Sequence, residues 1–259
     1  MRAIYLPGMT GWKWVDTVLI LYILLGILGV VGLVLLFLTA CWLPVDPNRY
    51  YENDSRFYRV LINVIAAVAC WGGGLRLHVT GTEKLPKGKR LLFVGNHVSN
   101  YDPIVTLYAL HKWNIAFISK PSNFKLPWLG RFVRRCCFMD IDRENPRNAI
   151  HTINRAAELL KRQEVSVGVY PEGTRSKTGQ LLPFHNGVFK VAQKAEADMA
   201  VVSVIGTEKV ARNYPFRRTD VYLDVLEVLP SAELHKTKTE VIGARVAELL
   251  LQNKEKREG

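Results

Sequence analysis

Several features that identify common classes of soluble protein are missing from this sequence. Its four cysteines form no C-x-x-C spacing, so we expect no bound metal and interpret them as buried thiols of a reducing compartment. No G-x-S-x-G segment occurs, which argues against the covalent seryl intermediate of an α/β-hydrolase. No helix-turn-helix pattern and no aromatic–basic repeat is present. The positive net charge is therefore the only feature that favours nucleic-acid binding.

Charge is absent from one long stretch near the N-terminus. No charged residue occurs between Asp16 and Asp46, which leaves the 29 residues from Thr17 to Val45 uncharged. As a helix this run would reach about 43 Å, more than the hydrocarbon thickness of about 30 Å, so we predict that it spans a membrane. Its end, Leu38–Cys41, matches a lipoprotein cleavage box, but the apolar run before it is too long for a signal sequence.

A second uncharged run, from Val60 to Leu75, is too short to cross a bilayer comfortably. Its 16 residues would reach about 24 Å as a helix, so we expect it to lie against the first helix or in one leaflet. Arg49, Arg56 and Arg59 follow the first run and favour a cytoplasmic position for the rest of the chain. We therefore expect N-terminal membrane-associated helices over residues 1–74.

Positive charge is in excess over the rest of the chain. The formal net charge is +12, and the residues after Pro44 carry 33 basic against 22 acidic side chains, an excess of 11. Nucleic acid, anionic lipid headgroups and an anionic substrate would each match this excess. Beside a membrane segment, anionic headgroups explain it with no further assumption. We therefore expect membrane lipids as partners and no nucleic acid.

From Leu75 onward, short apolar strands alternate with amphipathic helices. The expected strands are 75–80, 91–94, 115–119, 138–142, 165–170, 200–205 and 221–229, and the expected helices are 102–111, 146–163, 188–194 and 238–252. This order predicts an α/β domain over residues 75–259, with a mixed, largely parallel sheet flanked by helices, in which the last strands could pair antiparallel. We also expect Cys136 and Cys137 on a strand and the charged end, Asn253–Gly259, to fray.

One stretch, LLFVGNHVSNYDP at Leu91–Pro103, carries a histidine and then an aspartate five residues later. On a straight helix five residues turn through about 500°, which leaves the two side chains about 140° apart. His97 and Asp102 can therefore meet only if His97 lies on the turn after a strand and Asp102 near the start of the next helix. The Gly-Asn pair before His97 breaks the strand, and Asp-Pro has the form of an N-cap and first helical residue. Taken singly, these residues are better explained as an ordinary loop histidine and a helix cap than as a catalytic pair.

A second stretch changes that interpretation. Val165–Ser176, VSVGVYPEGTRS, ends another apolar strand in P-E-G-T-R-S. Together with N-H-x-x-x-x-D, about seventy residues earlier, it resembles the signature pair of the glycerophosphate acyltransferase family, and in particular the 1-acyl-glycerol-3-phosphate acyltransferases. The resemblance runs from about Leu75 to Leu229.

The resemblance implies transfer of a fatty acyl group from an acyl thioester to the free hydroxyl of 1-acyl-glycerol 3-phosphate (lysophosphatidic acid), which gives phosphatidic acid. It implies acyl-CoA or acyl carrier protein as the acyl donor and no permanently bound cofactor. His97 and Asp102 are then the catalytic pair: His97 is the general base for direct attack by the substrate hydroxyl, and Asp102 orients it. Two alternatives stay open: a different acceptor, such as glycerol 3-phosphate or another lysophospholipid, and a catalytically silent membrane lipid-binding protein.

Further residues are expected to bind the phosphorylated acceptor. They are Lys120, Arg143, Glu172, Gly173, Thr174 and Arg175. Arg175 offers a planar fork for a phosphate monoester, and Gly173 lets the backbone approach it closely. Glu172 is expected to orient Arg175 or to accept a hydrogen bond from a glycerol hydroxyl. Lys120 and Arg143, which each follow a strand, enter through the resemblance alone.

The sequence departs from the family pattern in two places. Family members usually carry lysine where His185 or Asn186 stands, and prolines where Ala200 and Ser203 stand. The first departure affects one phosphate contact, and the second affects specificity for the acyl donor or acceptor. Ser99, between the histidine and the aspartate, is expected to cap the helix rather than to act as a nucleophile.

Overall fold

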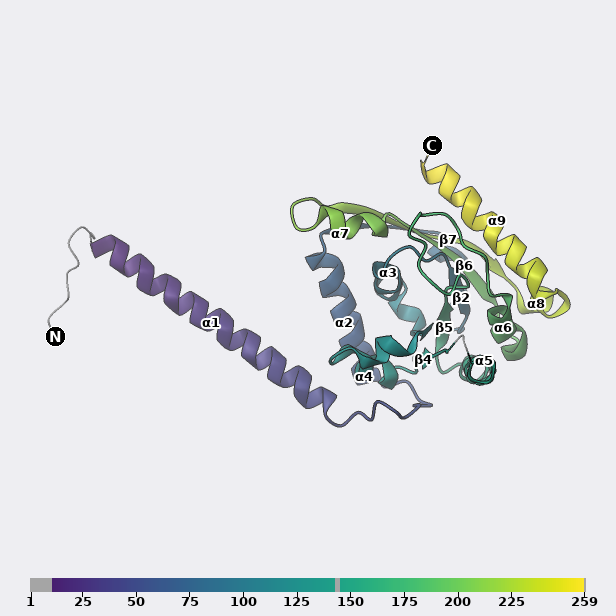
Figure 1. The fold of residues 1–259 in the computed structure, drawn as a ribbon, viewed down its shortest axis with the longest axis horizontal. Coiled ribbons are helices and arrows are strands. Elements are labelled where there is room, and N and C mark those ends of the chain that lie inside the picture. Colours follow the sequence, from purple (N-terminus) through teal and green to yellow (C-terminus); the bar gives the residue numbers. More distant parts are fainter. Residues whose placement is uncertain (1–10, 143–144, 259) are drawn as a thin grey trace. The chain divides into compact units, whose positions relative to one another are not determined.

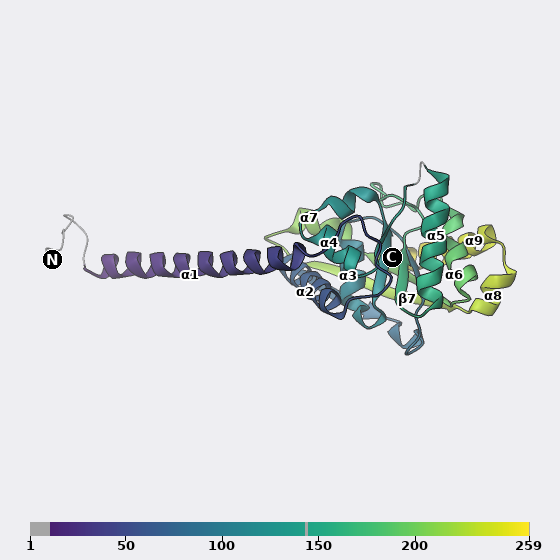
Figure 2. The ribbon, with the colours of Figure 1, turned by 90° about the horizontal axis from the view of Figure 1, so that it is seen from below.

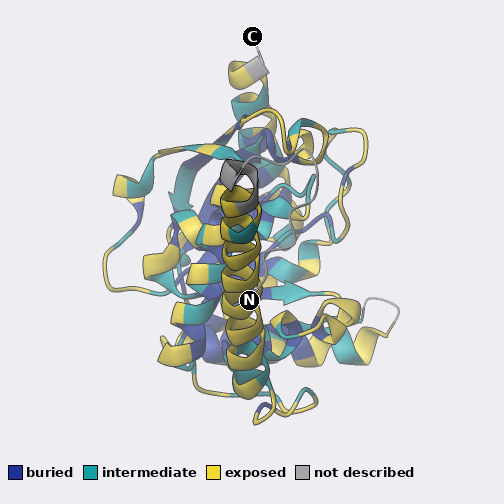
Figure 3. Cartoon of the chain, turned by 90° about the vertical axis from the view of Figure 1, so that its left-hand side faces the viewer, coloured by how far each residue is buried: buried dark blue, intermediate teal, exposed yellow. Residues whose placement is uncertain are grey.

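The computed structural model describes residues 11–142 and 145–258, and the chain divides into two compact units, Met1–Asp46 and Pro47–Gly259. The first unit contains α1 (Gly11–Trp42), one uninterrupted helix. From Val15 onward its residues are mostly apolar and mostly exposed (Figure 3). Val15–Trp42 is long and apolar enough to cross a membrane, so the predicted N-terminal span is present as a candidate.

The second unit is an α/β domain. Its helices are α2 (Arg56–Gly72), α3 (Tyr101–Ala109), α4 (Leu129–Arg135), α5 (Pro146–Lys161), α6 (Lys190–Ala195), α7 (Val210–Asn213), α8 (Ser231–Lys236) and α9 (Thr239–Glu258). Its strands are β1 (Leu75–Thr80), β2 (Leu92–Gly95), β3 (Ile115–Ser119), β4 (Met139–Asp140), β5 (Ser166–Val169), β6 (Met199–Ile205) and β7 (Thr219–Leu229).

The strands form one sheet in the order β1-β7-β6-β2-β5-β3-β4. Neighbouring strands are parallel except β6 and β7, which pair antiparallel. Helices α2, α3 and α4 lie on one side of the sheet, and α5, α6, α8 and α9 lie on the other (Figures 1 and 2). The predicted fold class, a mixed and largely parallel sheet flanked by helices, is therefore confirmed.

The central strands explain why the carboxyl edge of the sheet can hold a site. β2 and β5 are buried along their whole length, and their sequences, which are apolar except for Ser166, fit strands covered on both faces. β2 lies between β5 and β6, and β3 lies on the other side of β5. Because β2, β3, β5 and β6 run parallel, the loops that leave their carboxyl ends meet at one edge, where open α/β sheets bind ligands.

The second helix, α2, has one buried face, and this face packs against α3 and α4. Arg59 on that face is 4% exposed, pairs with Asp54 at 3.0 Å, and donates to the carbonyl oxygens of Ile115 and Cys136. By these contacts α2 belongs to the α/β unit, so the unit begins at Pro47, before the boundary expected after residue 74. Membrane association of residues 1–74 and the cytoplasmic position of the domain stay predictions.

Two local predictions in the second unit are wrong. Cys136 and Cys137 do not lie on a strand but in the turn after α4, where burial raises the pKa of each thiol to about 12. The charged end does not fray, since α9 continues to Glu258. Asn253 and Arg257 on this last stretch bond the buried carboxylate of Asp224 on β7, a partner far away in the sequence.

Candidate active site

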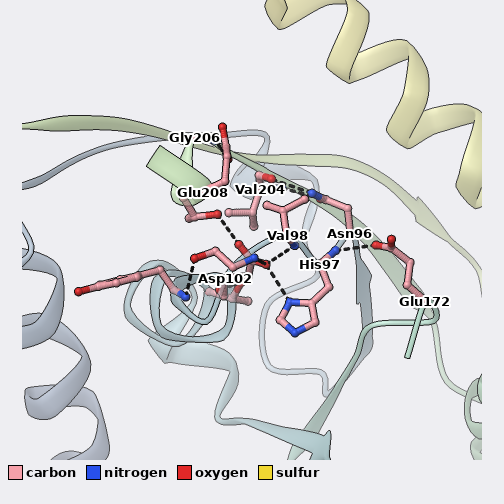
Figure 4. A network of polar contacts seen from close by, with 12 residues as sticks. Asn96, His97, Val98, Asp102, Glu172, Val204, Gly206 and Glu208 are labelled. Atoms are coloured by element: carbon pink, nitrogen blue, oxygen red, sulfur yellow. Dashed lines mark hydrogen bonds and ion pairs between the residues drawn. The ribbon is translucent and has the colours of Figure 1, made fainter. Parts of the chain in front are cut away.

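The turn after β2 is fastened to the neighbouring strand β6. Gly95 ends β2, and a β-carbon there would lie 2.7 Å from the carbonyl oxygen of Val202, so only glycine fits. Asn96 follows, and its side-chain amide accepts from the N–H of Val204 at 2.9 Å and donates to the Val204 carbonyl at 2.8 Å. The Asn96 amide thereby extends the hydrogen bonding between β2 and β6 by one residue beyond the end of β2. It fixes the position at which His97 leaves the sheet (Figure 4).

His97 and Asp102 meet as the sequence predicts, with the histidine on the turn and the aspartate in the first turn of α3. Nδ1 of His97 lies 2.8 Å from Oδ2 of Asp102 (Figure 4). One detail differs: α3 begins at Tyr101, so Asp102 is inside the helix and is not its N-cap. Ser99 holds the helix start instead, because its hydroxyl accepts the N–H of Tyr101 at 3.2 Å.

The Asp102 carboxylate is completely buried and surrounded by donors. Oδ2 also accepts the backbone N–H groups of Val98 and Ser99, at 2.7 and 2.8 Å, and Oδ1 accepts the hydroxyl of Thr207 at 2.5 Å. A carboxylate with this set of partners acts as an acceptor only, so Nδ1 of His97 must carry the proton. Nε2 then has a free lone pair. It has no hydrogen-bond partner among the described residues, and 18% of the side chain is exposed.

An aromatic stack supports one face of the His97 imidazole ring. Tyr170 directly follows β5, and its ring lies 4.3 Å from the His97 ring with 9° between their planes. The Phe117 ring lies 5.3 Å from the Tyr170 ring. Gly168 on β5 leaves room for the Phe117 ring, because a β-carbon at this position would lie 2.5 Å from that ring. The Tyr170 hydroxyl is buried without a hydrogen bond among the described residues, and burial, with the nearby charge of Asp102, holds its pKa well above the ordinary value. Tyr170 is therefore a neutral, rigid support for the histidine ring.

The P-E-G-T-R-S turn holds the backbone of His97 from both sides. Oε1 of Glu172 accepts the His97 N–H at 2.7 Å, and the Ser176 N–H donates to the His97 carbonyl at 2.8 Å. The other oxygen of Glu172 accepts the Leu182 N–H at 2.9 Å. Glu172 is 3% exposed, and burial raises its pKa while these two N–H groups oppose the rise. Its observed contacts thus position the histidine, a role that the sequence did not suggest, and substrate binding by Glu172 stays a prediction.

The remaining candidates for acceptor binding lie on the same edge of the sheet. Gly173 takes up a left-handed conformation at φ +71°, which favours glycine, and the two residues after it, Thr174 and Arg175, are exposed. Arg175 makes no side-chain hydrogen bond or ion pair with any described residue. Lys120 follows β3, is exposed and is likewise without such a partner in residues 11–142 and 145–258. Arg143 lies outside the described residues.

The two departures from the family pattern lie in different surroundings in the structure. The Asn186 side chain lies against Gly243 on α9. A β-carbon at Gly243 would be only 2.3 Å from the side-chain oxygen of Asn186. Ala200 and Ser203 are both buried in β6, next to β2. His185 is exposed, so only the departures at Ala200 and Ser203 fall on buried positions.

Thr207 and Tyr170 are site residues that the sequence analysis missed. Thr207 directly follows Gly206 at the carboxyl end of β6, and nothing in its local sequence indicates that β6 lies beside β2. Tyr170 precedes Pro171 at the carboxyl end of β5, and an aromatic side chain immediately before the P-E-G-T-R-S motif is the signal that could have identified it.

Replacement of Thr207 by valine is expected to lower the stability of the folded domain. The valine removes the donor to Oδ1 of Asp102 and leaves a buried carboxylate oxygen unsatisfied, which typically costs about 1–3 kcal/mol. The measurement is the free energy of unfolding in detergent for Thr207→Val and for Thr207→Ser, which keeps the hydroxyl. Destabilisation by Thr207→Ser but not by Thr207→Val would show that the methyl group, and not the hydroxyl, stabilises this position.

Comparisons with known proteins agree with the motifs. The family model described as Acyltransferase matches residues 76–206. A chloroplastic 1-acyl-sn-glycerol-3-phosphate acyltransferase of Arabidopsis thaliana is 32% identical over 166 residues, which cover 64% of this chain and 44% of the relative. A 1-acyl-sn-glycerol-3-phosphate acyltransferase of Borreliella burgdorferi is 25% identical over 182 residues, 68% of this chain and 72% of the relative. This chain thus spans less than half of the plant relative.

A solved structure shares the fold. The crystal structure of the 1-acyl-sn-glycerophosphate acyltransferase PlsC from Thermotoga maritima superposes with a TM-score of 0.65 at 25% sequence identity. The match covers 78% of this chain and 80% of that one.

Proposed function

Since the chain belongs to the acyltransferase family, we propose that it transfers a fatty acyl group from a thioester to the free hydroxyl of 1-acyl-glycerol 3-phosphate, giving phosphatidic acid. The resemblance recognised in the sequence is confirmed by the family match over residues 76–206. The observation that carries the proposal is the His97–Asp102 pair, with Nδ1 turned to a buried carboxylate and Nε2 turned away from it (Figure 4).

In the proposed reaction Nε2 of His97 removes the proton from the glycerol hydroxyl as its oxygen attacks the thioester carbonyl. The new O–C bond forms, the C–S bond breaks, and the imidazolium returns its proton to the departing thiolate, which leaves as a free thiol. Asp102 stabilises the imidazolium and keeps the proton on Nδ1, as in a Ser-His-Asp triad with the substrate's alcohol in place of serine. The donor, acyl-CoA or acyl carrier protein, is the only cosubstrate, and no permanent cofactor takes part.

Direct attack also fits the position of Ser99. Its hydroxyl accepts the N–H of Tyr101 at the start of α3 and so serves the helix. The two cysteines after α4 are buried with pKa values of about 12, which disfavours a thiolate nucleophile there.

The phosphate of the acceptor is assigned to the exposed cations at the carboxyl edge of the sheet. Arg175 lies in the turn that holds His97, and its guanidinium has no competing acid among the described residues. A guanidinium can bind a phosphate monoester through two parallel hydrogen bonds, and Thr174 supplies a nearby backbone N–H group. The Gly173 N–H donates to the Tyr170 carbonyl at 2.9 Å, so Gly173 contributes only the close approach of its backbone. Lys120, and Arg143 by its resemblance alone, are proposed as further phosphate contacts.

Replacement of Arg175 by alanine is expected to raise KM for lysophosphatidic acid by about tenfold or more, because a hydrogen bond to a charged group contributes about 1.5–3 kcal/mol. Initial rates over a range of acceptor concentrations measure this. Lys177→Ala, a change of another exposed cation two residues further on, is the matched control and should leave KM near that of the natural chain. An unchanged KM for the acceptor with a raised KM for the acyl donor would reassign Arg175 to the donor.

The acceptor itself is tested by identifying the product. The full chain in detergent or vesicles is supplied with isotope-labelled acyl-CoA and, in parallel, with lysophosphatidic acid, glycerol 3-phosphate and other lysophospholipids. Labelled phosphatidic acid from lysophosphatidic acid, in excess over the other products, supports the proposal. Preferred labelling of another acceptor would revise the substrate, and lipid binding with no labelled product from any acceptor would favour a silent lipid-binding protein.

A further inference from the structure

A short exposed segment from the end of α7 to the start of β7 carries an uncommon combination of side chains. We call residues 212–218, RNYPFRR, the aromatic–arginine loop. Phe216 is 94% exposed and Tyr214 is 58% exposed. The three arginines of the loop are exposed too, and their side chains make no ion pair or hydrogen bond with the part of the chain that the structure describes. Large exposed apolar side chains rimmed by uncompensated charge indicate an interaction surface.

The backbone of this loop is held in place. The N–H of Tyr214 donates to the Val210 carbonyl at 2.9 Å, and the N–H of Arg217 donates to the Asn213 carbonyl at 2.8 Å. The Asn213 side chain donates to the Thr219 hydroxyl at 2.9 Å, where β7 begins. Phe216 is therefore presented to the surroundings by a structured turn.

The loop lies beside the end of α2, at the point where the chain enters β1 (Figure 1). The Thr219 N–H donates to the Gly74 carbonyl at 3.0 Å, and a β-carbon at Gly74 would lie 3.8 Å from the Arg217 carbonyl oxygen. Trp71, in the last turn of α2, is 84% exposed. Since three residues extend over at most about 11 Å, Trp71 and the loop are neighbours on the surface.

Trp71 is the end of an apolar stripe along the exposed side of α2. The stripe residues are Phe57, Val60, Val64, Val68 and Trp71, and each is more than half exposed. They recur three or four positions apart, which places them on one face of the helix, opposite the buried face that packs on α3 and α4. The stripe and the aromatic–arginine loop thus form one apolar surface with arginines at one end.

We propose that the aromatic–arginine loop inserts at the headgroup boundary of an anionic membrane and extends the lipid-facing surface of α2. Aromatic rings are favoured at the level of the headgroups, and arginines are attracted to anionic lipid. The loop contains no acidic residue, and the chain carries both a net charge of +12 and a candidate membrane span. A lipid surface matches all of these features. The proposal does not depend on the acyl-transfer chemistry.

This surface is close to the turn that carries the catalytic pair. A β-carbon at Gly73, at the end of α2, would lie 3.3 Å from the ring of Tyr101, the residue before Asp102. Thr207, whose hydroxyl donates to Asp102, lies just before α7, and the loop begins at the end of α7. Insertion of the loop would therefore hold the His97 site near the membrane surface, where a lysolipid is found.

Lipid contact at the loop can be measured directly in the full chain. We suggest attaching an environment-sensitive fluorophore to Phe216→Cys in a Cys41→Ser background, since the three other native thiols are buried. Glu158→Cys is the matched control, because its side chain is 71% exposed on α5, on the other side of the sheet from α2 and α7 (Figures 1 and 2). Both proteins are reconstituted in phosphatidylcholine vesicles with and without phosphatidylglycerol, containing a lipid-borne quencher.

The expected result is quenching at position 216 but not at 158, stronger with phosphatidylglycerol and weakened in an Arg217→Gln/Arg218→Gln variant. Salt at about 1 M, where the screening length falls to about 3 Å, should weaken it likewise. A fluorophore at 216 that is as polar and as little quenched as the one at 158 in both kinds of vesicle would overturn the proposal. Thermal unfolding of each labelled protein confirms that the comparison is between folded chains.

Discussion

Replacement of His97 by alanine is expected to lower kcat by about 10²–10⁴ or more, the range that a positioned general base supplies. Alanine removes Nε2, the one nitrogen that the site leaves free to accept a proton, while Asp102 and the acceptor-binding cations stay in place. The acyl donor and acceptor should still bind. Rates of thiol release at saturating lysophosphatidic acid measure the loss, and titration of the acceptor shows whether binding survives.

The fold should survive this substitution. Glu172 and Ser176 bind the backbone N–H and carbonyl of residue 97, and these bonds do not require the imidazole. The matched control is His111→Ala, because His111 is an exposed histidine just after α3 and its change should leave kcat unaltered. Retained activity in purified His97→Ala would contradict the assignment of the base.

Replacement of Asp102 by asparagine is expected to lower kcat by about 10²–10⁴, with KM for the acceptor nearly unchanged. The asparagine oxygen can take the place of Oδ2 and accept from His97 and from the N–H groups of Val98 and Ser99, so the geometry is retained. What is lost is the negative charge that stabilises the imidazolium. Steady-state kinetics of the variant test this separation of kcat from KM.

A double variant decides whether Asp102 acts through the histidine. If it does, adding Asp102→Asn to His97→Ala should reduce the remaining rate little further, because the two residues act as one unit. Losses that multiply in the double variant would instead give Asp102 an independent role. Asp102→Glu is a less useful control, since the longer side chain does not fit a fully buried position with these four donors.

The local part of the site could be predicted from the sequence, because it depends on a turn between adjacent elements. Five residues on a straight helix keep two side chains apart, so a strand, a Gly-Asn turn and a helix start were needed to bring His97 and Asp102 together, and the structure contains them. The helix begins at Tyr101, one residue before the expected cap, so Asp102 lies in its first turn.

The parts that depend on long-range packing could not be predicted. Thr207 reaches Asp102 because β6 pairs with β2, and no local pattern in the sequence specifies which strands are neighbours. Glu172 was expected to contact Arg175 or the substrate, and its backbone bonds to His97 and Leu182 became visible only in the fold. The end of α9 was expected to fray because its sequence is charged, and its partner Asp224 lies on a strand remote in sequence.

The division between the N-terminal helices shows the same limit. Two apolar runs are helices, as predicted, and their lengths already separate a candidate span from a shorter helix. The sequence does not show which faces of these helices are buried. α1 is exposed and apolar along its described length, whereas α2 buries one face on α3 and α4 and exposes an apolar stripe. The charge count alone did not indicate that Arg59 is used inside the domain, where it pairs with Asp54.

The central claim is that His97 activates the acceptor hydroxyl for direct attack on the thioester. It is tested most directly by following free thiol released from acyl-CoA by the natural chain and by His97→Ala, each with and without lysophosphatidic acid. The account predicts rapid release by the natural chain only when the acceptor is present, and almost none by the variant under either condition. Equal release by both proteins, or a full equivalent of thiol released by the natural chain without acceptor, would contradict it.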